Sequence, residues 1–153
     1  MPSLIPTSVY AAESTKLLNN LPSDLVKQFV VAGHNDLNKL KELLKEEPNL
    51  IYARFDWGRG DFEEAIEGAA HVGNKKIINF LIENGARLNL FVLAVLGKED
   101  ALLPMLQAYP KLLFAKGAHG FSLLHHAKKG GTEAEGIVKY LKGKGLTKEK
   151  FDI

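Results

Sequence analysis

The residues best suited to chemistry in this chain are its five histidines, and cysteine is absent. An imidazole can bind a metal ion or exchange a proton near neutral pH. His125 and His126 are adjacent, so on a helix their rings diverge rather than share one ion. Spacings typical of zinc sites, such as His-Glu-x-x-His or paired cysteines, are not found. We therefore predict no metal and no cofactor. A zinc site made from His71, His119 and a carboxylate is the less favoured alternative.

Carboxylates gather between residues 56 and 67, and paired carboxylates held about 5–9 Å apart can perform acid–base catalysis. The members of this acidic cluster are Asp56, Asp61, Glu63, Glu64 and Glu67. The cluster overlaps a Gly-rich stretch, and we expect a solvated loop rather than a catalytic pair. Its Gly58-Arg59-Gly60 turn lacks the Gly-x-x-x-x-Gly-Lys pattern of a phosphate-binding loop, and no Gly-x-Ser-x-Gly element occurs. These residues therefore do not indicate a catalytic site.

The elements that would position these residues are helices, because apolar pairs recur with a residue of the same kind three positions ahead. Spacings of three and four lie on one helical face. The intervals between pairs are 38, 24 and 35 residues. The pairs are Leu43-Leu44, Leu81-Ile82, Met105-Leu106 and Tyr140-Leu141, and the preceding residues are Leu40, Ile78, Leu102 and Ile137. We interpret each unit as two short helices that must stack on their neighbours to bury their apolar faces.

Residues 120–127 read Gly-Phe-Ser-Leu-Leu-His-His-Ala, and two further stretches, 69–74 and 84–89, also match known motifs. The first stretch resembles the signature G-x-T-P-L-H-x-A of the ankyrin-repeat family. Residues 69–74 are similar to A-A-x-x-G-x, and residues 84–89 to x-G-A-D-V-N. The chain also resembles uncharacterised bacterial ankyrin proteins that carry D-W-G and G-x-H-G stretches. The resemblance implies an all-α, ankyrin-like solenoid of about four helix pairs. The alternative is a bundle of four helix pairs without ankyrin geometry.

We divide the chain into a capping segment, 1–23, and an ankyrin-repeat domain, 24–153. The four units cover approximately residues 24–54, 55–89, 90–116 and 117–153. A helix over Ser8–Asn20 is expected to shield the first unit. The loops that project between ankyrin units are called fingers here. The second unit has a long, Gly-rich finger at residues 56–61, whereas the third has almost none, because Asn89 leads directly into an apolar run.

The resemblance assigns roles to the histidines and to two of the carboxylates. His125 matches the signature histidine, which usually makes a structural hydrogen bond, and His126 falls at a buried position. Glu64 and Glu67 take the threonine and histidine positions of the signature in the second unit, where they can act as substitute hydrogen-bonding groups. His34 is expected to be exposed near the first turn. His71 faces the concave groove of such an array, and His119 lies in the fourth finger.

The candidate binding site therefore lies between two fingers. We expect it to contain Trp57, Asp61, His71, Phe91, Val95 and His119. The missing third finger would leave Val95 and Leu96 as an exposed apolar patch, a feature that marks binding surfaces. Trp57 either anchors a partner or packs against the neighbouring unit and fills that gap.

Composition limits the partners that this site can bind. The chain has 153 residues, 46% hydrophobic and 25% charged, with a net charge of +2. This charge is too small to suggest a nucleic-acid surface, and no run of 18 apolar residues suggests a membrane span. The ankyrin resemblance implies a non-enzymatic module that binds a protein or peptide partner in its concave groove, and we expect it to be cytoplasmic. The alternative is a small-molecule binding protein or minor enzyme with a pocket between the second and fourth fingers. A homodimer through the same groove is a third interpretation.

Overall fold

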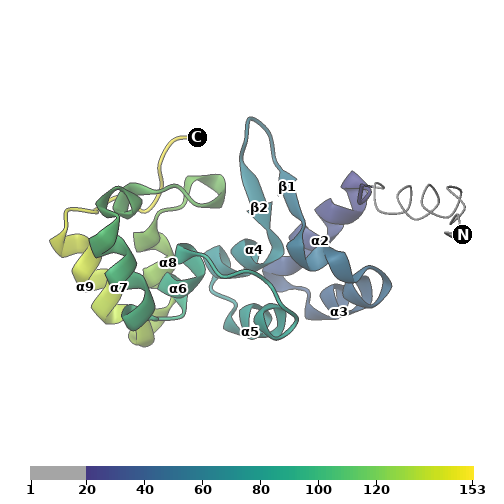
Figure 1. Ribbon diagram of the computed structural model, residues 1–153, viewed down its shortest axis with the longest axis horizontal. Coiled ribbons are helices and arrows are strands. Elements are labelled where there is room, and N and C mark those ends of the chain that lie inside the picture. Colours follow the sequence, from purple (N-terminus) through teal and green to yellow (C-terminus); the bar gives the residue numbers. More distant parts are fainter. Residues whose placement is uncertain (1–19) are drawn as a thin grey trace, which may run out of the picture.

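The computed structural model describes residues 20–153, and the capping helix expected over Ser8–Asn20 falls almost entirely outside them. Within this range the chain is mostly helical, with eight α-helices and one two-stranded antiparallel hairpin (Figure 1). The expected predominance of helix is confirmed. None of the helices in the described range is long and apolar enough to cross a membrane.

The helices follow one another as short pairs. They are α2 (Ser23–Asn35) with α3 (Leu37–Glu46), α4 (Ala65–Val72) with α5 (Lys75–Glu83), α6 (Leu90–Val95) with α7 (Glu99–Ala108), and α8 (Leu123–Lys129) with α9 (Glu135–Gly143). Short 3₁₀ turns occupy Pro48–Tyr52, Pro110–Phe114, Ala118–Gly120 and Gly131–Ala134. The first helices of successive pairs contact one another, α2 with α4, α4 with α6 and α6 with α8. In Figure 1 the pairs α2 with α3 and α4 with α5 follow one another along the molecule, and the other two pairs overlap at the opposite end.

Side-chain caps begin several of these helices, which is why they start where they do. In each case an Asp, Asn or Ser oxygen accepts a hydrogen bond from a backbone N–H in the first turn. The capping residues are Asp36 for α3, Asn74 for α5, Asn89 for α6 and Ser122 for α8. Gly73 closes α4 with φ of +82°, a left-handed conformation that glycine adopts without steric cost. Because Asn89 caps α6 directly, the third unit has no room for a finger, as expected.

The apolar faces form two adjoining core clusters. The four residues that precede the apolar pairs are all fully buried: Leu40, Ile78, Leu102 and Ile137. The first cluster draws mainly on α2 to α5, and the second on α6 to α9. Helix α6 contributes to both, with Val92 and Val95 in the first and Phe91 and Ala94 in the second. The helical phase predicted from the sequence is therefore confirmed at these positions.

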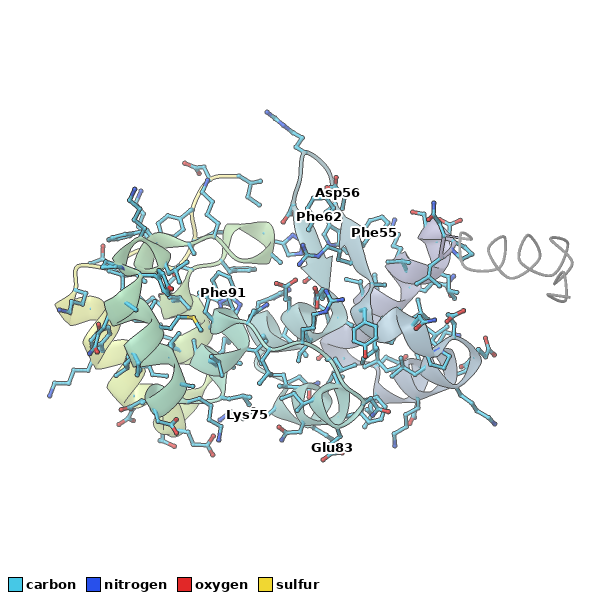
Figure 2. All side chains as sticks on the ribbon, in the orientation of Figure 1. Phe55, Asp56, Phe62, Lys75, Glu83 and Phe91 are labelled. Atoms are coloured by element: carbon cyan, nitrogen blue, oxygen red, sulfur yellow. The ribbon has the colours of Figure 1, made fainter. Side chains whose placement is uncertain are left out.

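The segment predicted as the second finger forms a β-hairpin that rises above the row of helices. Strand β1 (Arg54–Asp56) pairs with β2 (Phe62–Glu64), and Phe55 lies opposite Glu63. In the connecting loop, Asp56 Oδ1 accepts hydrogen bonds from the backbone N–H groups of Gly58 and Gly60, at 2.8 and 3.1 Å. Figure 2 shows Phe55, Asp56 and Phe62 on the hairpin, on the opposite side of the molecule from Lys75 and Glu83 of α5. The hairpin thereby places its inward-facing residues above α2 and α4.

Candidate functional site

The centre of the candidate site is the carboxylate of Glu63, whose side chain is 0% exposed. Its Oε1 accepts a hydrogen bond from His71 Nε2 at 2.9 Å, and its Oε2 accepts one from Trp57 Nε1 at 2.8 Å. Two further imidazoles approach the carboxylate. His34 Nε2 lies 3.4 Å from Oε1, and His119 Nε2 lies 3.4 Å from Oε2. Three histidines and one indole thus surround a single buried carboxylate. The expectation that Glu63 belongs to a solvated loop is wrong, because β2 directs this side chain towards the helices.

Close packing of α2 against α4 brings His34 above His71. A Cβ at Gly33 would lie 2.3 Å from the carbonyl oxygen of Ala65, so only glycine allows the two helices to approach this closely. A Cβ at Gly68 would lie 2.8 Å from His34 Cε1, so the missing side chain leaves space for the imidazole. As a result, His34 Nε2 lies 3.1 Å from His71 Nε2. His34 is 24% exposed and joins the cluster, rather than standing free near the first turn as expected.

Asp61 holds His119 at two points. Its Oδ1 accepts a hydrogen bond from the His119 backbone N–H at 2.7 Å, and its Oδ2 lies 2.8 Å from His119 Nδ1. His119 has φ of +57°, an unusual conformation for a residue other than glycine. Because strained backbone of this kind persists only where its surroundings enforce it, the two bonds to Asp61 explain how the ring is held. Asp61 and His119 are 58 positions apart in the chain, so these bonds join the hairpin loop to the turn before α8.

The hydrogen-bond partners also fix where the protons lie on two of these rings. His34 Nδ1 lies 3.2 Å from the carbonyl oxygens of Val30 and Val31, which can only accept. In His119 the acceptor beside Nδ1 is Asp61. Each neutral ring therefore carries its proton on Nδ1 and presents the lone pair of Nε2 towards Glu63. In this form the Nε2 atoms of both rings and the Glu63 carboxylate are all hydrogen-bond acceptors, and few N–H groups lie between them.

The charge state of Glu63 follows from competing effects. Burial alone raises the pKa of the Glu63 carboxyl. The hydrogen bond from His71, the attraction of a protonated His34 and the hydrogen bond from Trp57 outweigh burial, so the pKa lies below its ordinary value. The buried carboxyl is therefore ionised at neutral pH and gives the site a negative charge.

Glu67 lies one turn before His71 on α4 and serves a different purpose. One of its oxygens accepts a hydrogen bond from the Glu64 backbone N–H at 2.7 Å, and the other accepts one from Asn89 Nδ2 at 2.9 Å. Burial raises the pKa of Glu67, and the nearby Glu64 charge also raises it, against the lowering effect of the backbone hydrogen bond. Glu67 thus links the start of α4 to the start of α6. Both of its carboxylate oxygens are thus hydrogen-bonded within the fold.

An open groove leads to the cluster along the outer side of α2. Its volume is about 730 Å³, and its lining includes Lys27, Val31, Ala32, His34, Trp57 and His119. Trp57 packs edge-on against Phe55, with ring centroids 4.9 Å apart, so it is partly buried and partly presented to the groove. His119 is 29% exposed, and it lies between this groove and a second hollow that is lined by the C-terminal residues 150–153.

The structure brings together four of the six residues predicted for the site. Trp57, Asp61, His71 and His119 all belong to the cluster or contact it. Phe91 and Val95 do not. Val95 is 0% exposed in the first core cluster, and Phe91 is buried against His126, with ring centroids 5.0 Å apart. The exposed apolar patch expected at Val95 is therefore absent at that position, because the short helix α6 turns these side chains into the two cores.

The remaining histidines behave as the signature implies. His125 Nε2 donates a hydrogen bond to the backbone carbonyl of His71 at 2.8 Å, and His126 Nδ1 donates one to the carbonyl of Ser122 at 2.8 Å. Their structural roles are confirmed. His34 and Glu63 are the members of the site that the sequence interpretation missed. One available signal was the position of His34 directly after Ala32-Gly33, which matches the position of His71 directly after Ala69-Ala70.

Protein-family models, curated proteins and solved structures were each compared with this chain, and none matches it.

Proposed function

We propose that this protein is a non-enzymatic binding module with an ankyrin-like stack of four helix pairs, and that it binds an extended segment of a partner protein. Two features support the ankyrin-like interpretation. The first helices of successive pairs form one row, α2, α4, α6 and α8, and a β-hairpin finger projects from that row (Figure 1). Arrays of this kind bury their apolar faces between neighbours and leave a surface free for partners.

The groove along α2 is the observation that carries the proposal. It is open, with a volume of about 730 Å³, and Val31 in its lining is 51% exposed. Trp57 stands at one wall, where a partly buried indole is a favoured anchor for a partner side chain.

The charge at the rim of the groove indicates what the peptide should carry. Lys27 Nζ lies 5.8 Å from the Trp57 ring centroid and 5.6 Å from that of Phe55. Because this ammonium group lies beside the apolar wall, it can form an ion pair with an acidic residue of the peptide when the neighbouring peptide residue is apolar and packs against that wall. The groove therefore fits a segment in which an apolar residue is next to an acidic one.

A small-molecule ligand is the second candidate, and one observation favours it. Glu63 is fully buried and hydrogen-bonded by Trp57 and His71, an arrangement of convergent polar groups found in ligand pockets. Such a ligand would enter from the same groove and contact His34 and His119 at its floor. The side chains of Val31 and Lys27 would contribute little to its binding.

The peptide proposal can be tested with a library of displayed random peptides. Peptides selected on the full chain should share an apolar residue beside an acidic one. Val31→Asp and Lys27→Glu should each weaken their binding by about tenfold or more, since each opposes one of the two contacts. Lys76→Glu, on the exposed side of α5, is the matched control and should bind as the parent protein does. Selected peptides that bind Lys27→Glu and Val31→Asp unchanged would show that the groove is not the binding surface.

A further inference from the structure

We propose that His34, Glu63, His71 and His119 together bind one divalent transition-metal ion, for which Zn²⁺ is the best fit. One ligand atom from each residue can be chosen so that all four lie within 4.8 Å of one another. The set comprises three imidazole nitrogens and one carboxylate oxygen. This inference does not depend on a peptide partner, because it rests on side chains beneath the groove.

The spacing of the ligand atoms matches the size of a zinc site. Zinc bonds to nitrogen and oxygen are about 2.0–2.1 Å, so the corners of a tetrahedron around the ion lie about 3.3 Å apart. Glu63 Oε1 lies 2.9 Å from His71 Nε2 and 3.4 Å from His34 Nε2. The two histidine nitrogens are themselves 3.1 Å apart. Movements of a few tenths of an ångström would therefore complete that face of a tetrahedron.

The fourth ligand, His119, approaches from the opposite finger. Its Nε2 lies 3.4 Å from the second carboxylate oxygen, Oε2. The ring centroids of His71 and His119 are 5.5 Å apart and nearly perpendicular, at 80°. The rings thus converge on the carboxylate from different directions, as ligands around one ion do. His119 and His34 are partly exposed, so an ion can enter from the groove.

The surrounding residues orient the ligands in the way that metal sites require. A metal-binding histidine usually donates its other N–H to a carboxylate or a backbone carbonyl. His34 has the carbonyl of Val30 for this bond, and His119 has the carboxylate of Asp61. Glu63 is oriented in turn by the indole N–H of Trp57. In their neutral forms His34 and His119 therefore direct their Nε2 lone pairs inwards before any ion arrives, whereas His71, which donates from Nε2 to Glu63, must move its proton to Nδ1 to bind the ion.

The cluster has more hydrogen-bond acceptors than donors when its histidines are neutral. His71 Nε2 is close to both Glu63 Oε1 and His34 Nε2, and it can donate only one hydrogen between them. The lone pairs of His34 and His119 face a carboxylate that also only accepts. With both rings neutral, a bound cation would turn these approaches into bonds.

The types of ligand also indicate which ions should bind. Imidazole suits zinc, copper, nickel and cobalt, whereas magnesium and calcium prefer sites made wholly of oxygen. Three nitrogens and one oxygen without thiolate therefore favour Zn²⁺ or Co²⁺ over Mg²⁺ or Ca²⁺. Because the ligands come from α2, β2, α4 and the turn before α8, a bound ion would also join four separate elements and stabilise the folded chain.

The test uses the full chain without a histidine tag, stripped by a chelator. Titration calorimetry with Zn²⁺ should show one ion per chain, and saturation should raise the melting temperature, whereas Mg²⁺ should change neither. Co²⁺ should bind at the same site and give visible absorption bands of a four-coordinate ion, which Zn²⁺ then displaces. Absence of Zn²⁺ binding to the unaltered chain would overturn the proposal outright.

Matched variants then show whether the four residues are the ligands. Glu63→Gln and His34→Gln should lower the affinity for Zn²⁺ by more than about 100-fold, and Asp61→Asn, which alters only the orientation of His119, by about 10- to 100-fold. Glu67→Gln and His125→Gln replace a neighbouring carboxyl and histidine outside the cluster, and they should bind within about threefold of the parent chain. Equal affinities across the ligand variants and these controls would refute the assignment.

Two further measurements separate loss of the site from loss of the fold. Circular dichroism of the metal-free variants should match that of the parent chain. If Glu63→Gln fails to fold, the partly exposed His34→Gln decides the question, because its ring lies at the rim rather than in the core. Val31→Asp, which is designed to weaken peptide binding, should bind Zn²⁺ normally. Its behaviour distinguishes failure of the metal site from failure of the peptide groove.

Discussion

His126 on α8 is a histidine whose environment opposes protonation. It is 2% exposed, it donates Nδ1–H to the Ser122 carbonyl, and it packs against Phe91. Burial lowers its pKa from 6.5 to about 4, against a smaller opposite effect of the Ser122 hydrogen bond. The folded state therefore keeps this ring neutral where the unfolded chain would take up a proton.

We predict that this histidine makes the fold sensitive to acid. Its pKa is lower in the folded state, so its contribution to stability is fully present above pH 6.5 and is lost as the pH falls towards 4. The free energy of unfolding should drop by about 3 kcal/mol over that window. Urea melts at pH 7, 6, 5 and 4 would measure the drop. In His126→Gln, which keeps a donor for Ser122, the slope against pH should be shallower. Parallel curves for the two proteins would refute the prediction.

Glu63 shows why a residue can be present in the sequence and still be misjudged. It lies in a run of acidic residues beside a Gly-rich turn, and such runs are usually solvated. Its burial depends on the hairpin register, which places it opposite Phe55 and above His71. The residues next to Glu63 in the sequence do not indicate this position in the fold. Trp57 could be singled out because tryptophan is rare in this chain, but its hydrogen bond to Glu63 could not.

At the scale of elements, the contact between α2 and α4 depends on two glycines that work differently. The nearest atoms to a Cβ at Gly33 belong to the Ala65 backbone, whereas those at Gly68 belong to the movable ring of His34. We predict that Gly33→Ala destabilises the fold by about 1–3 kcal/mol through overpacking, in spite of the better helix propensity of alanine. Urea melts would measure it.

Gly68→Ala is the matched variant and should behave differently. Alanine favours the helix by up to about 1 kcal/mol, and the His34 ring can move aside, so stability should change little or rise. Affinity for Zn²⁺ should fall, because the ring is displaced from the cluster. If the two alanine variants melt at the same urea concentration, the backbone contact at Gly33 does not control this interface.

Much of the element order could be predicted because each helix carries its own local signals. Apolar spacing located the buried residues Leu40, Ile78, Leu102 and Ile137, and Asn89 directly before an apolar run indicated a helix without a preceding finger. The site was only partly predicted. Asp61 and His119 were placed together because they lie on two fingers, whereas His34 required knowledge of how closely α2 approaches α4, which depends on glycines in both helices.

At the scale of the whole molecule, Leu81 tests how the core holds the chain together. It is fully buried on α5 in the first core cluster. We predict that Leu81→Ala lowers the free energy of unfolding by about 2–5 kcal/mol, because truncation leaves a cavity. Lys76→Ala, on the exposed face of the same helix, should cost less than about 0.5 kcal/mol. Equal urea midpoints would contradict the assigned helical phase.

Lys75 would be a poorer control for that comparison than its neighbour. Its ammonium group donates to the Gly130 carbonyl at 2.8 Å and pairs with Glu133. These contacts join α5 to the turn after α8, so loss of Lys75 would combine a surface charge effect with a change between distant units.

The division of α6 between two cores has a consequence for the chain as a whole. Val92 and Val95 complete the first cluster, while Phe91 and Ala94 complete the second, all within one helix of six residues. If either half of the chain unfolds, the core cluster of the other half loses side chains of α6 that it needs. Neither half therefore has a complete hydrophobic core by itself. Although the chain consists of successive short helix pairs, α6 should couple its two halves, so that they unfold together in one cooperative transition.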